Sequence, residues 1–175
     1  MITKNDLLES MIHEANVCKH LHGKIPPDGF DFRPTPGQRS TLELLRYLSL
    51  VGIAATRSII EGSWDVWGAY AEAARQMAPE DFPGAMDRQM EELRALFARF
   101  SDEEFATRRV QLPWRDDVTL EHAVFDTVYK WFVGYKMQLF LYLKLMGRAE
   151  LGTLNCWRGS DPISRPEPVE PAVAG

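Results

Sequence analysis

The chain has 175 residues, 45% of them hydrophobic and 26% charged, as expected for one globular domain with a substantial core. Its net charge is −5 and it has no cluster of Lys and Arg. The sequence therefore predicts no nucleic-acid partner, because phosphate binding needs a basic surface. No apolar run approaches the roughly 20 residues of a membrane span, and the first twenty residues lack the apolar core of a signal peptide. We expect a cytoplasmic protein without membrane contact.

The pattern of apolar residues, caps and prolines predicts helices throughout. The expected helices cover residues 5–20, 40–61, 63–78, 84–100 and 119–147. The first is expected to begin at Asn5 or Asp6, and the second at a capping box formed by Ser40 and Glu43. We find no convincing strand. The fold class predicted is all-α, a four-helix bundle with a long crossover and one additional helix.

The connections are also informative. Four prolines and three glycines exclude a helix over residues 23–39, and the apolar residues among them predict an ordered segment that crosses the bundle. Residues 108–118 are expected to be irregular, and residues 148–161 to form a loop that Trp157 anchors. We expect one domain over residues 1–158 and a flexible or loosely packed tail over residues 159–175.

The two cysteines, Cys18 and Cys156, provide neither a disulfide framework nor a C-x-x-C pair. Cys18 lies on the apolar stripe of the first helix, which predicts a buried thiol. His122 and Asp126 form an i, i+4 pair, but helical phase turns His122 away from Trp131. In the helix over residues 63–78, Trp64, Trp67 and Tyr70 are spaced to share one face.

Two segments resemble the DinB-like superfamily of four-helix bundles. The first is RPTPGQRSTLELLRYLSLVG (residues 33–52), similar to that family's proline-containing loop, Ser/Thr cap and E-L-L-x-H pattern. The second is LPWRDDVTLEHAVFDTVYKWFVGYKMQLFLYLKLMG (residues 112–147), similar to the family's L-P-W, T-L-x-x-A, H-x-x-x-H-x-x-Q and L-x-x-x-G motifs. The resemblance implies a DinB-like bundle and, since such proteins often form dimers, a homodimer.

In that family three histidines typically hold nickel, zinc or iron, and members with the complete site include thiol-dependent transferases and isomerases. The matching positions here carry Tyr47, Trp131 and Tyr135, whereas Gln138 is kept. An indole nitrogen only donates a hydrogen bond, and a neutral phenol is a poor metal ligand. We therefore predict no metal, no cofactor and no catalytic residue at these positions.

Two interpretations of the aromatic replacement stay open. The rings of Tyr47, Trp131 and Tyr135 can simply complete the core, or together with Gln138 they can line a pocket for a small apolar or cationic ligand. We expect a non-catalytic small-ligand-binding or interaction protein. The alternative is a metal- or thiol-dependent transferase or hydrolase with a relocated or degenerate site, and a third class is a structural or regulatory partner of another protein.

Overall fold

The first two core helices begin at polar side chains that satisfy free backbone N–H groups. In the computed structural model, which describes residues 3–162, Thr3 caps α1 (Lys4–His22) in a reciprocal box with Asp6. Ser40 and Glu43 form the predicted box at the start of α2 (Thr41–Glu61), which ends at Gly62 with φ 68°. The prediction for α2 was right at both ends, whereas α1 begins earlier than expected.

The remaining elements follow in chain order: α3 (Asp65–Arg75), α4 (Phe82–Phe97), α5 (Asp102–Thr107), β1 (Arg109–Leu112), β2 (Arg115–Thr119), α6 (Leu120–Ala123), α7 (Lys130–Leu145) and α8 (Thr153–Arg158). A 3₁₀ turn over Pro79–Asp81 precedes α4, and a π-helical turn over Val124–Tyr129 joins α6 to α7. Among the described residues, no helix is long and apolar enough to cross a membrane.

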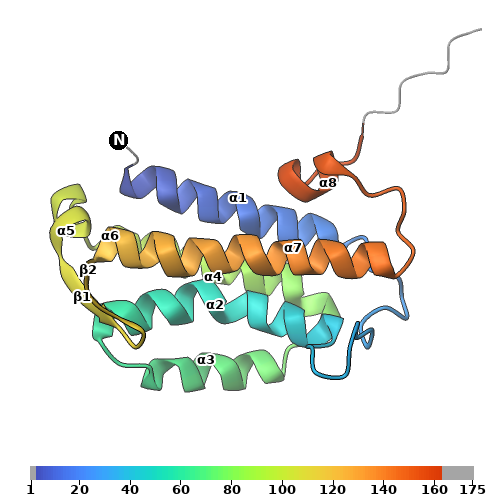
Figure 1. The fold of residues 1–175 in the computed structure, drawn as a ribbon, viewed down its shortest axis with the longest axis horizontal. Helices are drawn as coiled ribbons and strands as arrows, with labels where there is room; N and C mark the ends of the chain where they lie inside the picture. Colours follow the sequence, from blue (N-terminus) through green and yellow to red (C-terminus); the bar gives the residue numbers. More distant parts are fainter. Residues whose placement is uncertain (1–2, 163–175) are drawn as a thin grey trace, which may run out of the picture.

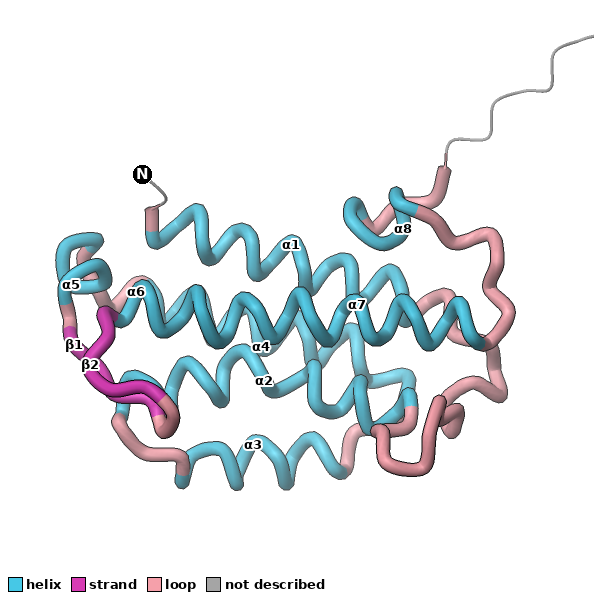
Figure 2. The backbone as a smooth tube through the Cα atoms, in the orientation of Figure 1, coloured by secondary structure: helices cyan, strands magenta, loops and turns pink. Residues whose placement is uncertain are grey.

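Four long helices form the bundle (Figures 1 and 2). Helix α7 packs against both α1 and α2, and α4 packs against the same two helices from behind in this view. Helix α3 lies outside the bundle and packs against α2, as the additional helix predicted from the sequence. The hairpin and α5 cover one end of the bundle, and α8 lies near its other end. The predicted all-α bundle is therefore confirmed.

Three local expectations were wrong. Residues expected to be irregular form the antiparallel hairpin β1–β2, in which Val110 pairs with Val118. The loop expected after residue 147 contains the short helix α8, which packs on α1. The expected single helix over residues 119–147 is interrupted by the π-helical turn, where the extra residue per turn changes the helical phase just before Trp131.

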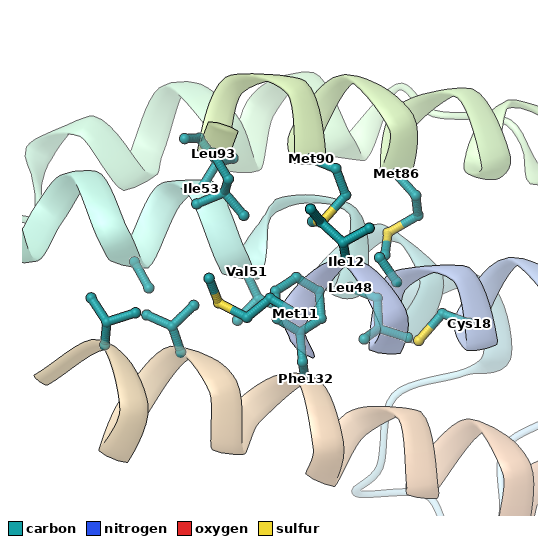
Figure 3. Close-up of a cluster of buried hydrophobic side chains, with 14 of the residues drawn as sticks. Met11, Ile12, Cys18, Leu48, Val51, Ile53, Met86, Met90, Leu93 and Phe132 are labelled. Atoms are coloured by element: carbon teal, nitrogen blue, oxygen red, sulfur yellow. The ribbon is translucent and has the colours of Figure 1, made fainter. Parts of the chain in front are cut away.

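The core is built from the inward faces of α1, α2, α4 and α7 (Figure 3). Phe132 from α7 lies near Met11 from α1 and Val51 from α2, and all three are fully buried or nearly so. A Cβ on Gly52 would lie 2.5 Å from the Phe132 ring, so this glycine permits the close approach of α2 and α7. Cys18 is fully buried, as predicted.

The proline-rich connection over residues 23–39 is ordered, as predicted. Backbone N–H groups of Thr41 and Leu42 donate to the carbonyls of Phe32 and Phe30, which ties the connection to the start of α2. The Phe32 ring packs edge-on against Tyr142 of α7, with centroids 5.8 Å apart. This connection therefore ends beside α7 and places Arg39 there.

Candidate aromatic ligand site

The structure brings Tyr47 of α2 directly against Tyr135 of α7. Their ring centroids are 4.7 Å apart in an edge-to-face arrangement, a favourable geometry for two aromatic rings. Both side chains are partly buried and pack against the edge of the core. We call Tyr47 and Tyr135 the tyrosine pair. Trp131 lies one turn before Tyr135 on α7 and reaches Tyr47 through a shared neighbour, Trp67 of α3.

Four tryptophans from three separate segments continue this aromatic surface. The ring centroids are 5.8 Å apart for Trp64 and Trp67, and 6.4 Å apart for Trp67 and Trp131. They are 5.9 Å apart for Trp131 and Trp114, and 5.8 Å apart for Trp114 and Trp64, which closes a circuit of four rings. We call these four residues the tryptophan ring. The sequence predicted that Trp64 and Trp67 share a face, but the positions of Trp114 on the hairpin turn and of Trp131 beside them depend on the tertiary fold.

Arg39 is the cation of this site, and sequence reasoning missed it. Its guanidinium lies over the Tyr47 ring at 4.1 Å from the centroid, and 5.6 Å from that of Tyr135. Gln138 is linked to the backbone of Arg39 through Tyr142. Its Nε2 donates to the Tyr142 hydroxyl at 2.7 Å, and that hydroxyl donates to the Arg39 carbonyl at 2.9 Å. In the sequence, only the position of Arg39 at the end of the proline-rich connection could have indicated that it reaches the tyrosine pair.

The chemistry of these side chains does not fit a divalent metal. Burial, together with the neighbouring Tyr135, raises the pKa of the Tyr47 phenol, so it remains protonated at neutral pH. The Trp131 indole offers no lone pair for coordination. Over residues 3–162, no three His, Cys, Asp or Glu side chains group together in the way a metal site needs.

Polar residues at the end of α2 and the start of α3 pair with near neighbours in sequence. Glu61 pairs with Arg57 at 3.0 Å, and Asp65 accepts from the Ser63 hydroxyl at 2.9 Å. His122 is exposed, and its Nε2 contacts Arg115 at 2.9 Å. None of these contacts reaches the tyrosine pair.

A second polar cluster lies under α8, on another face of α7. Lys136 is completely buried, and its Nζ is 2.8 Å from Glu14 Oε2 without forming a well-directed hydrogen bond. The same ammonium lies 4.0 Å from the centroid of the Trp157 ring. Burial raises the pKa of both the Cys18 and Cys156 thiols beside this pair. Trp157, expected to anchor this segment, is 48% exposed and covers the buried ammonium with its ring, whereas the buried residues of α8 are Asn155 and Cys156.

Two hollows in the surface lie away from the tyrosine pair. One, of about 470 Å³, lies between α2, α3 and α4 and includes Tyr70, Arg88 and Glu92 in its lining. Another, of about 290 Å³, is lined by residues that include His122 and Phe125. Neither is lined by the residues expected to form the pocket (Tyr47, Trp131, Tyr135 and Gln138). The candidate site is therefore an aromatic surface and not one of these hollows.

Fold and site together describe a helical bundle with an aromatic surface formed by α2, α3, α7 and the hairpin turn. More particularly, the fold is DinB-like. The chain is similar to the crystal structure of a DinB-like protein, YjoA, from Bacillus subtilis, with a TM-score of 0.64 and 20% sequence identity over 84% of this chain and 95% of that one. The resemblance expected from the motifs is thus confirmed for the fold. No protein-family model and no curated protein matches the sequence.

Proposed function

We propose that this DinB-like protein binds a small ligand or a partner at its aromatic surface and does not catalyse a reaction there. The observation that carries the proposal is the side-by-side packing of Tyr47 and Tyr135, with Arg39 stacked over them. Rings and a guanidinium provide contact area, cation–π attraction and hydrogen-bond donors. They provide no general base and no nucleophile at neutral pH.

Thiol-dependent chemistry has little support from the described cysteines. A thiol reacts as its thiolate, and burial raises the pKa of Cys18 and disfavours that form. Cys156 is also buried, and burial raises its pKa too. This argues for a structural role of both thiols and against a catalytic cysteine supplied by this chain.

The catalytic alternative can be tested by metal binding. Untagged protein is exposed to excess nickel or zinc, passed through a desalting column and analysed by elemental mass spectrometry. We expect far less than one equivalent of metal. The triple variant Tyr47→His, Trp131→His and Tyr135→His should gain metal binding. A control variant that carries Tyr129→His in place of Tyr135→His should not. One equivalent bound by the wild type would favour the metal-dependent enzyme instead.

The binding function itself can be tested by screening small aromatic and apolar fragments against ¹⁵N-labelled protein. Fragments that bind should shift amide signals in α2 and α7 around the tyrosine pair, and Tyr47→Ala should abolish those shifts. Phe125→Ala, which removes an exposed ring elsewhere, should leave them intact. Binding that survives Tyr47→Ala would place the ligand site somewhere else on the molecule.

Three further expectations are kept as proposals: a single domain over residues 1–158, a cytoplasmic location and a homodimer. Trp67 of α3 is turned toward Tyr47 of α2 and Trp131 of α7 and does not offer its ring to a second copy. The outer face of α7 instead exposes Leu141 at 51% and Leu145 at 64%, one turn apart. Light scattering on Leu141→Glu/Leu145→Glu should show a monomer if this face joins two copies.

Most of the tail over residues 159–175 lies outside the described residues.

A further inference from the structure

We infer that the tryptophan ring is a binding site for a quaternary ammonium group. This inference rests on the proposed function, because Trp131 belongs both to the predicted pocket and to the ring. Four of the five tryptophans of the chain take part in the circuit. No aromatic contact joins the diagonal pairs, Trp64 with Trp131 or Trp67 with Trp114, in the described part of the chain.

The spacing of the rings suits a cation of this size. With neighbouring centroids 5.8–6.4 Å apart, the midpoint of the circuit lies within roughly 6 Å of every centroid whatever the shape of the circuit, the range over which a cation is attracted to an aromatic face. Tryptophan is the most effective of the aromatic side chains for this interaction. Four indoles around one point would therefore add their attractions for a single positive charge.

One side of the circuit can open. Rings at these spacings already touch, so a ligand enters only if one of them moves. Trp114 is the ring with the least packing, because it lies at the turn between β1 and β2 and is 56% exposed. We expect Trp114 to rotate outward to admit the ligand and then to close on it, while Trp64, Trp67 and Trp131, which are partly buried, keep their positions.

The surroundings favour a cation over an anion. Arg39 stacks on the tyrosine pair and not on an indole, so it leaves the faces of the tryptophan ring unoccupied by a cation. The Asp65 carboxylate follows Trp64 directly in sequence, and the net charge of the chain is −5. Arg115, the cation that follows Trp114, pairs with Asp126 at 3.3 Å. Among the described residues, no Lys or Arg lies over a ring of the circuit.

The tryptophan ring is also expected to prefer a methylated ammonium group to a primary ammonium group. A primary ammonium group brings three N–H donors that need acceptors when they leave water, and an indole supplies none. Methyl groups remove those donors and pack against the indole faces. A choline-like trimethylammonium head group is therefore the ligand chemistry that the site fits.

The test compares choline with 3,3-dimethylbutan-1-ol, its uncharged analogue of the same shape, by ¹H–¹⁵N NMR of the indole N–H signals. Choline should shift four of the five signals saturably and leave that of Trp157 unchanged. The uncharged analogue should bind at least ten-fold more weakly. Trp114→Ala should weaken choline binding at least ten-fold, whereas Phe125→Ala should not change it. Trp67→Phe, which keeps a ring, is a second variant should Trp114→Ala disturb the hairpin.

Each outcome has a separate meaning. Equal binding of choline and its uncharged analogue would overturn the inference while supporting the proposed binding of apolar ligands. No shift of the four signals with either compound would overturn the ring as a ligand site. The proposed function would then be judged by the fragment screen at the tyrosine pair, whose result does not depend on a cation.

Discussion

Two faces of α7 differ in burial, although the residues that define them are neighbours in sequence. Tyr135 faces α2 and forms part of a partly exposed aromatic surface. Lys136, the next residue, faces α1 and is completely enclosed with Glu14 under Trp157. Both faces pair a cation with aromatic rings, since Arg39 stacks on the tyrosine pair and Lys136 on Trp157.

The difference between the two faces lies in access. Arg39 is exposed and its guanidinium can exchange its contact with tyrosine for one with a ligand. Lys136 has no such freedom, because an ammonium without its carboxylate partner would be a buried uncompensated charge. The proposed binding role therefore falls to the aromatic face, whereas the charged face holds α1, α7 and α8 together.

Breaking the charged face should have the largest effect on stability. Glu14→Ala leaves Lys136 buried without its counter-charge, and we expect the free energy of unfolding to fall by about 3–5 kcal/mol. Urea denaturation followed by circular dichroism would measure this change. A loss below about 1 kcal/mol would mean that water reaches Lys136 or that α8 moves away from it.

The matched control replaces both charges together. Glu14→Leu combined with Lys136→Met removes the charged pair and keeps an apolar packing unit of similar length. Such replacements are often neutral or stabilise a protein by about 1–4 kcal/mol. We expect the double variant to be at least as stable as the wild type, to within about 1 kcal/mol.

Truncation on the aromatic face should cost less. Trp131 is only partly buried, so Trp131→Ala should lower the free energy of unfolding by roughly 2 kcal/mol, below the roughly 3–5 kcal/mol of a core tryptophan. Trp114→Ala, at a mostly exposed position, should cost no more than about 0.5 kcal/mol. If Trp131→Ala costs as much as Glu14→Ala, the aromatic face is core and its proposed binding role loses support.

The sequence predicted the bundle well because periodicity and caps are local signals. Ser40, Glu43 and Gly62 define α2 by short-range hydrogen bonding and backbone conformation alone. The hairpin was missed because its pairing, such as Val110 with Val118, is formed by strands of only four and five residues. Short strands of this kind leave too little alternation to distinguish them from a loop.

The site was predicted only in part for the same reason. The resemblance located Tyr47 and Tyr135, which do meet. It did not locate Arg39, which depends on the path of a proline-rich connection, or Glu14, whose partner lies 122 positions away in the sequence. Lys136 illustrates the limit, since a lysine on an apolar helix is expected to reach solvent unless a distant carboxylate is known to meet it.

The smallest predicted effect is a pH dependence confined to the charged face and α8. His20 Nε2 lies 3.1 Å from Asn155 Nδ2, which donates to it and also to Asp161 at 2.9 Å. Burial lowers the pKa of His20, with Asp161 opposing this and Lys24 reinforcing it. Because the unfolded value is about 6.5, this contribution to stability is complete above that pH and is lost as the pH falls through the lower folded value.

Hydrogen-exchange protection factors, corrected for intrinsic rates, would detect this local effect. On going from pH 7.5 to 5.5, protection of the α8 amides should fall, while amides of α2 beside Tyr47 should keep theirs. Tyr47 does not titrate in this range, since burial moves the pKa of its phenol upward. His20→Gln, which keeps an acceptor for Asn155 but cannot gain a proton, should make α8 insensitive to pH. A parallel loss of protection on both faces would mean that α7 couples them and that they do not act separately.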